Sequence, residues 1–236
     1  MVDLTQEQSR FILANICEPG DSRLNKIANS YNWSEMVLDP KLLPEIYQSK
    51  ITADKISKLL DEFVLANFLT PSSEFWPSGL NDLGFNCPIG LWYRGQIEKL
   101  NPISIAIVGA RGASVYGVNA ASEIAMELAA LNINIISGGA IGIDAASHQG
   151  ALQGNGFTVS VMAGGVDCLY PKTNSNLFER ILETGLIVSE VPPDSQPLRH
   201  RFLIRNRLIA AISRATLVVE ARIKSGAMST ANEPTN

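Results

Sequence analysis

The sequence predicts an α/β fold: a mostly parallel sheet with helices on both of its faces, preceded by a small helical N-terminal domain. Two observations carry this prediction. In the second part of the chain, short apolar stretches alternate with helical patterns, and the stretches cover residues 104–109, 133–137, 158–164, 186–191 and 216–221. This alternation is typical of right-handed βαβ units and a parallel sheet covered on both sides. Before residue 70, apolar residues recur at helical spacing instead.

The chain divides into three parts. Residues 1–70 form the small helical domain, with expected helices at 5–16, 22–31 and 53–69 that Pro and Gly separate. Residues 71–100 are a linker and leading strand segment, rich in Pro, Gly and Ser, with a short strand expected at 91–93. Residues 101–236 form the α/β core.

Composition is that of an ordinary soluble protein. The 236 residues are 46% hydrophobic and 7% aromatic, which suffices for a full core. The start shows no basic leader followed by an apolar stretch, and no apolar run approaches the roughly 20 residues of a membrane span. We therefore expect a cytoplasmic protein without membrane contact. Cys17, Cys87 and Cys168 have no CxxC spacing, so neither a disulfide framework nor a zinc site is indicated.

Positive charge is concentrated in one stretch of an acidic chain. The formal net charge is -4, yet residues 195–219 contain five arginines and no Lys, Asp or Glu. Such a run is often only a solvated helix face. The absence of acidic neighbours instead favours unpaired arginines that recognise an anion at one place, and the planar guanidinium suits phosphate.

The loops after the five apolar stretches are expected to meet at one edge of the sheet. Parallel strands point the same way, and open α/β folds bind ligands outside the carboxyl ends of their strands. These loops are rich in Gly and small residues, which let backbone amides approach a ligand, and each precedes a helix whose N-terminus offers free N–H groups. The arginine run joins the same edge. Glycine-rich turns are also ordinary connections in any α/β sheet, so a purely structural role stays open for each loop.

Familiar small-ligand patterns are absent from these loops. The glycines of residues 109–117 do not form G-x-G-x-x-G, nothing matches G-x-x-x-x-G-K-[ST], and Ser137 stands where a dinucleotide fold would place a ribose-binding acid. We therefore expect no cofactor. Asp144 and His148 stand at i and i+4, but no third metal ligand is evident, and Asp144 is expected to cap or orient its turn.

Three aromatic residues near these loops have two open interpretations. Tyr116, Tyr170 and Phe202 either stack on bases or pack in the core. The sequence alone does not separate the two.

A series of motifs resembles one known family. The stretches "IAIVGARGASVYG", "IISGGAIGIDAASHQGAL", "VMAGGVDCLYPKTNSNL", "SEVPP", "RFLIRNRLIAAISRATLVVEA" and "KSGAMSTA" occur in the order, and at about the spacing, of the DNA-processing protein A (DprA/Smf) family. The resemblance is close from residue 76 to residue 231. It implies a Rossmann-like core that binds single-stranded DNA and helps load the recombinase RecA onto it in natural transformation and recombination. It implies no catalytic turnover.

The resemblance also assigns roles to particular residues. Arg111 takes the place of the arginine in the family's G-S-R turn, and Asn206 with Arg207 matches its R-N-R signature. From the arginine run, the loops and the resemblance together, we expect nucleic acid to be bound by Gly109, Arg111, Ser137, Gly138, Gly142, Arg199, Arg201, Phe202, Arg205, Asn206, Arg207, Lys224, Ser225 and Gly226.

The sequence departs from the family pattern in three places. Ala110 replaces a frequent Ser, Gly139 replaces a usual Leu, and the chain ends at Asn236, where family members continue through another helix and strand. We therefore expect a C-terminally shortened member, whether a natural short form or a truncated reading. Because surfaces for self-association and RecA contact extend into that portion in the family, a homodimer is left open.

An enzyme on a similar sheet is the alternative from another class. Phosphoribohydrolases of the LOG type, which act on nucleotides, need a P-G-G-x-G-T loop followed by a glutamate for acid–base chemistry. The candidate loops here begin at Ser137 and Ala163, and neither carries that glutamate. A pure interaction scaffold, with the helical N-terminal region binding a partner, is a third interpretation.

Overall fold

The structure is a computed structural model that describes residues 3–100, 103–221 and 226. Its N-terminal part is a set of short helices: α1 (Gln6–Ile16), α2 (Ser22–Ile27), α3 (Trp33–Leu38), η1 (Pro40–Leu42), α4 (Glu45–Gln48) and α5 (Ala53–Phe63). Polar caps fix several of their starts. Thr5 and Gln8 form a capping box at α1, and Asn32 and Glu35 form one at α3.

The rest of the chain alternates strands and helices, as the sequence predicts. The strands are β1 (Phe68–Leu69), β2 (Leu91–Gly95), β3 (Ser104–Val108), β4 (Asn134–Ser137), β5 (Thr158–Met162), β6 (Leu186–Ser189) and β7 (Ala215–Val218). The helices are η2 (Ser78–Asn86), η3 (Ile97–Lys99), α6 (Val115–Ala130), α7 (Ile143–Gln153), η4 (Lys172–Asn174), α8 (Ser175–Thr184) and α9 (Arg201–Ile212).

Within the part of the chain that the structure describes, the seven strands form one sheet in the order β1-β2-β6-β5-β4-β3-β7. The pairs from β6 to β7 are parallel, which confirms the mostly parallel sheet. Strands β1 and β2 add to it antiparallel. The helix expected at 53–69 is wrong after Phe63, because Phe68 leaves the helix and packs on Trp92 of β2 with their ring centroids 4.8 Å apart.

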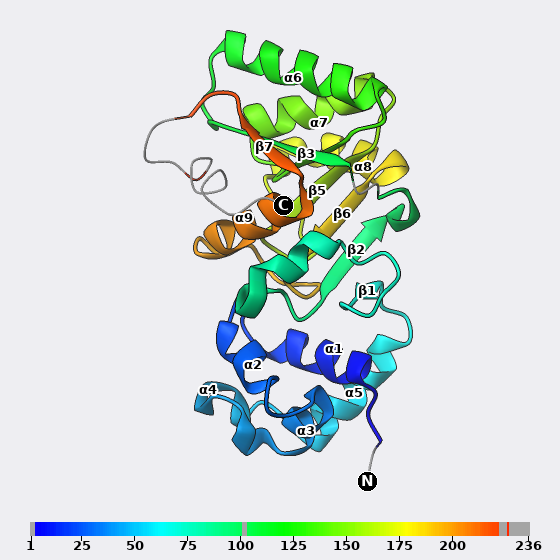
Figure 1. The fold of residues 1–236 in the computed structure, drawn as a ribbon, viewed down its shortest axis with the longest axis vertical. Coiled ribbons are helices and arrows are strands. Elements are labelled where there is room, and N and C mark those ends of the chain that lie inside the picture. Colours follow the sequence, from blue (N-terminus) through cyan, green and yellow to red (C-terminus); the bar gives the residue numbers. More distant parts are fainter. Residues whose placement is uncertain (1–2, 101–102, 222–225, 227–236) are drawn as a thin grey trace.

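Side chains alternate between the two faces of the sheet. Ile107 and Ile135 pack with α6 and α7 on one face, whereas Ala106 and Ile136 pack with α9 and η2 on the other. Figure 1 shows α6 and α7 together on one side of the strands and α9 apart from them. This arrangement places α9 beside the carboxyl end of β3, and α9 carries most of the arginine run.

The N-terminal helices share a core with the sheet. Phe11 of α1 lies between the rings of Phe63 and Phe68, at centroid distances of 5.3 and 5.2 Å. The same apolar cluster includes Phe178 of α8 and Ile187 of β6. Burying each such side chain contributes about 1.5–3 kcal/mol. The helical region below the sheet in Figure 1 is therefore packed onto it.

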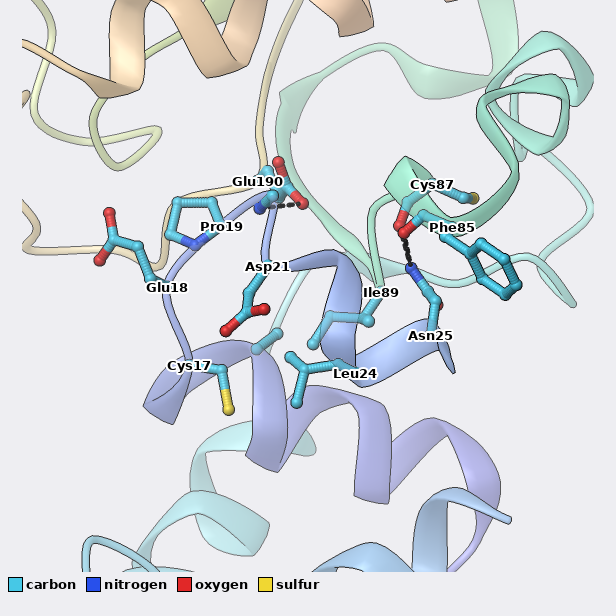
Figure 2. Close-up of a pocket in the computed structure, with 12 residues that line it drawn as sticks. Cys17, Glu18, Pro19, Asp21, Leu24, Asn25, Phe85, Cys87, Ile89 and Glu190 are labelled. Atoms are coloured by element: carbon cyan, nitrogen blue, oxygen red, sulfur yellow. Dashed lines mark hydrogen bonds between the residues drawn. The ribbon is translucent and has the colours of Figure 1, made fainter. Parts of the chain in front are cut away.

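Polar contacts also tie the helical region to the α/β core. Figure 2 shows residues 17–21, which connect α1 to α2, beside Glu190 at the end of β6. The backbone N–H of Gly20 donates to Glu190 Oε1 at 3.1 Å. On α2, Asn25 Nδ2 donates to the carbonyl oxygens of Phe85 (2.9 Å) and Cys87 (2.7 Å) (Figure 2). Among the described residues, no helix is long and apolar enough to cross a membrane.

Candidate functional site

A pocket of about 780 Å³ lies at the carboxyl end of β3, beside α9. Strand order reverses at this point, since β4 to β6 extend from one side of β3 and β7 pairs on the other. Open α/β sheets bind ligands at such a switch point. The lining residues are Val108, Gly109, Ala110, Arg111, Ala140, Asp144, Tyr170, Pro197, Arg199, Phe202, Leu203, Arg205, Asn206, Ile209 and Gly226.

The rim of this pocket combines positive charge with aromatic rings. We use "rim" for Arg111, Tyr170, Arg199 and Phe202. Arg111 and Arg199 are exposed, and the Arg111 guanidinium lies 5.4 Å from the centroid of the Phe202 ring. Phe202 meets Tyr170 edge to face at 5.7 Å, and Tyr170 is 46% exposed. The rim therefore offers cations for an anion and ring surfaces on which a planar group can stack.

These positions exclude core packing for Tyr170 and Phe202. Tyr170 and Phe202 line the pocket instead of the main core. Tyr116 does not pack in the core either, because it is 83% exposed on α6, and it does not line the pocket.

A second group of polar residues on α7 and α9 is buried, and we use "buried layer" for Asp144, His148, Arg205 and Arg207. Arg205 donates from Nη1 to the carbonyl oxygens of Gly138, at 2.8 Å, and of Val161. Burial lowers the pKa of Arg205 to about 10, so the guanidinium is still charged at neutral pH. Arg205 thus holds the ends of two neighbouring strands against α9. A side chain at Gly138 would collide with this guanidinium, which explains the glycine.

Asp144 belongs to the same layer and orients its turn, as the sequence predicts. Its Oδ2 accepts the backbone N–H of Ala140 at 3.3 Å. Burial raises the pKa of Asp144, and the nearby positive charge of Arg205 opposes that rise. The residue before α7, Gly142, has φ +83°, and a side chain there would strike the backbone of Ala110 and Arg111. Gly142 therefore lets two loops of the pocket approach closely.

His148 is fully buried and neutral. Thr158 donates its hydroxyl proton to the carbonyl of Ile135, so its oxygen accepts from Nδ1 of His148, at 2.7 Å. Nε2 of this histidine is buried without a hydrogen-bond partner. Burial, with a smaller contribution from the charge of Arg205, lowers the pKa of His148 to about 3.

The described residues hold no cluster of three or more His, Cys, Asp or Glu side chains suited to a metal ion. The three cysteines are free. Burial raises the pKa of Cys17 to about 12 and that of Cys87 to about 11, which keeps both thiols protonated and unreactive.

The structure corrects the expectation of free helix N-termini at this edge. At α6, the carboxylate of Glu220 accepts the backbone N–H of Ser114 at 3.0 Å and its hydroxyl at 2.7 Å. At α7, no side chain caps the N-terminus, and the backbone N–H of Ile143 donates to the carbonyl of Ala110 at 3.3 Å. Because groups of the protein itself bind at both termini, the positive character of the pocket comes from arginine side chains.

The structure also corrects the expectation of unpaired arginines. Arg207 forms a buried ion pair with Glu190 at 2.7 Å, and its Nε donates to the carbonyl of Asn86 at 2.9 Å. Arg201 pairs with Glu18 at 2.7 Å. Together with Arg205, these residues are bonded within the protein, whereas Arg199 and Arg214 are exposed. No local signal revealed these partners, because Glu18 and Asn86 are distant from the run in sequence and Glu190 lies before it, at the end of β6.

The remaining residues expected at the site fall into three groups. Ser137 is buried, and its hydroxyl donates to the carbonyl of Ile107 at 2.7 Å, so it braces two strands. Gly109 lines the pocket, and Asn206 donates to the carbonyl of Gly226 at 3.1 Å, which links α9 to Gly226. Lys224 and Ser225 lie outside the described residues.

Comparisons with known proteins agree on one family. The family model described as DNA recombination-mediator protein A matches residues 67–236. A putative DNA processing protein DprA from Mycobacterium tuberculosis is 43% identical over 175 residues, covering 69% of this chain and 45% of that protein. The DNA processing protein DprA of Streptococcus pneumoniae is 33% identical over 187 residues, covering 79% of this chain and 66% of that protein. The chain thus spans about half of the mycobacterial relative and two thirds of the pneumococcal one.

Two solved structures of this kind are similar to the chain. The X-ray structure of DprA from Streptococcus pneumoniae superimposes with a TM-score of 0.78 at 28% identity, covering 97% of this chain and 82% of that one. DNA processing protein A from Helicobacter pylori, described for its single-stranded DNA binding mode, superimposes with a TM-score of 0.63 at 32% identity. That match covers 70% of this chain and 74% of the other.

Proposed function

This chain belongs to the DNA recombination-mediator protein A family, and on that premise we propose that its pocket binds single-stranded DNA with little sequence preference. One observation carries the proposal. Arg111 faces solvent while lying against Phe202, so a cation and an aromatic face are presented side by side. A single strand offers both a phosphate and an unstacked base to such a pair, whereas a duplex keeps its bases stacked inside.

The arrangement of the rim suits backbone contacts more than base reading. Arg111 and Arg199 are suited to phosphate oxygens, and Phe202 and Tyr170 to the face of any base. Specific reading requires side chains that match the donors and acceptors of one base, and the proposal assigns none. We further propose that the bound strand is protected and passed to the recombinase RecA during transformation and recombination. The proposed role is binding without turnover.

The experiment is fluorescence anisotropy of the full chain with a labelled oligonucleotide, across a series of salt concentrations. We expect affinity to fall steeply with salt, with a log–log slope of about -0.7 for each phosphate neutralised. An unlabelled single strand of unrelated sequence should compete well, and a duplex of the same length should compete poorly. Affinity independent of salt, or a preference for the duplex, would contradict the proposal.

A parallel incubation distinguishes the enzymatic alternative. The chain is mixed with nucleoside monophosphates, and released free base is measured by chromatography. We expect no base to be released. Release at a rate proportional to protein concentration would favour the phosphoribohydrolase interpretation over DNA binding.

A further inference from the structure

Two side chains at the start of α9, the imidazole of His200 and the guanidinium of Arg201, face the helical region instead of the pocket. Arg201 Nε donates to Glu18 Oε1 at 2.7 Å, and Arg201 Nη2 donates to Glu18 Oε2 at 2.9 Å. His200 Nε2 lies 2.8 Å from the same Oε1. A guanidinium fork and an imidazole thus converge on one carboxylate, and they would present the same donors to a phosphate.

The carboxylate that fills this position comes from the segment joining α1 to α2. Figure 2 shows Glu18 pointing away from the small cavity bordered by Leu24 and Asn25. Its side chain is 39% exposed, and that of His200 is 56% exposed, so solvent reaches the ion pair. Hydrogen bonding from Arg201 keeps the pKa of Glu18 below its usual range, so Glu18 is an anion at neutral pH.

A second ion pair at the same junction behaves differently. Arg207 and Glu190 have side chains that are only 9% and 7% exposed, and Glu190 also accepts the N–H of Gly20. A buried pair of this kind is costly to separate. The pair of Glu18 with Arg201 is more open to solvent, since the Glu18 side chain is 39% exposed and that of Arg201 is 14% exposed. Another anion can therefore replace Glu18 at a lower cost than separating the buried pair.

The position of His200 and Arg201 makes a DNA phosphate the anion best placed to replace the Glu18 carboxylate. His200 and Arg201 lie between Arg199 and Phe202 in the chain, and both of those residues line the pocket. A strand that extends from the rim past Arg199 would reach them. In the free protein the positive charge of Arg201 is neutralised by Glu18.

We propose that His200 and Arg201 form a second phosphate site, which Glu18 fills in the free protein and which the backbone of a bound single strand takes over. The inference rests on the proposed function, because it concerns the same strand. Two consequences follow. The helical region lowers the DNA affinity of the core, and DNA binding releases the contact between residue 18 and α9.

The test is the single-strand affinity of Glu18→Gln in the full chain, measured by anisotropy with a labelled oligonucleotide. Removing the competing carboxylate should tighten binding by about 3- to 5-fold, since the exchanged pair is a weak one. The log–log salt slope should stay near the wild-type value, since the same phosphate occupies the site in both proteins once the strand is bound. Glu45→Gln is the matched control, because Glu45 is exposed on α4 and the net charge changes equally.

A second substitution separates release of Arg201 from a general change in charge. In an Arg201→Gln background, Glu18→Gln should no longer tighten binding. Circular dichroism establishes that each variant is folded, and Glu18→Ser, which also removes the carboxylate, should act in the same direction if Glu18→Gln folds poorly.

Each result bears on a different claim. If the wild-type chain binds no single strand, the proposed function fails, and the inference fails with it. If the wild type binds and Glu18→Gln binds no more tightly than Glu45→Gln, or more weakly, the inference alone is overturned. A gain that persists without Arg201 also overturns it.

Discussion

In the buried layer, Arg205 and Arg207 are each bonded within the protein, whereas at the rim Arg111 and Arg199 face solvent. The two regions use the same residue type and touch the same helix. The difference lies in their surroundings, since backbone carbonyls and Glu190 satisfy the first pair. A buried arginine therefore supports the fold, and an exposed one is available to a ligand. Substitutions in the two regions should have separable effects.

The largest expected effect is on stability, from Arg207→Met. This change leaves Glu190 as a buried carboxylate without its ion-pair partner, which costs about 3–5 kcal/mol. We expect the free energy of unfolding in urea to fall by that amount. The fraction of protein that stays folded should keep single-strand affinity near the wild-type value, because Arg207 does not line the pocket.

The control combines Arg207→Met with Glu190→Gln. The amide keeps an acceptor for the N–H of Gly20 but carries no charge, so part of the lost stability should return. A double variant less stable than Arg207→Met would show that the charge of Glu190 is not the source of the loss. Weak DNA binding by folded Arg207→Met would show that Arg207 contributes to DNA binding.

The comparison also explains which features the sequence could predict. The five apolar stretches identified β3 to β7, because a buried parallel strand is an unbroken apolar run. The sequence does not predict strand β1, because its two residues are too few to show the alternating pattern of a strand. Arginines at the rim and in the buried layer are alike in sequence. Their separation depends on Glu190 and on the carbonyls of Gly138 and Val161, whose approach to α9 is set by the packing of the whole fold.

A second prediction concerns the acid sensitivity of the buried layer through His148. Its pKa is about 3 in the folded chain, against 6.5 for an exposed histidine. Between these values the unfolded chain binds a proton and the folded chain does not, so stability falls as pH falls below about 6.5. The loss is about 1.4 kcal/mol per pH unit, or about 2–3 kcal/mol from pH 6 to pH 4.

His148→Asn should remove this part of the pH dependence. The amide of asparagine takes the place of the Nδ1 donor toward Thr158 and does not titrate. Urea unfolding at pH 6 and pH 4 gives the comparison, because the carboxylates of the chain contribute equally to both proteins. An unchanged difference between the two pH values would mean that His148 is protonated in the folded state and that the buried layer admits water.

The smallest expected effect is at the rim, from Arg111→Ala. An exposed guanidinium that contacts phosphate contributes a charged hydrogen bond, so single-strand affinity should weaken by about 1–2 kcal/mol for all sequences alike. The melting temperature should stay near the wild-type value, because Arg111 is exposed and its contact with Phe202 lies at the surface.

The matched control is Arg214→Ala, which removes the same charge from an exposed residue that does not line the pocket. Equal losses of affinity in the two variants would indicate a general electrostatic effect in place of a contact at the rim. A large fall in melting temperature for Arg111→Ala would instead remove the distinction between the two regions, because a rim arginine would then be supporting the fold.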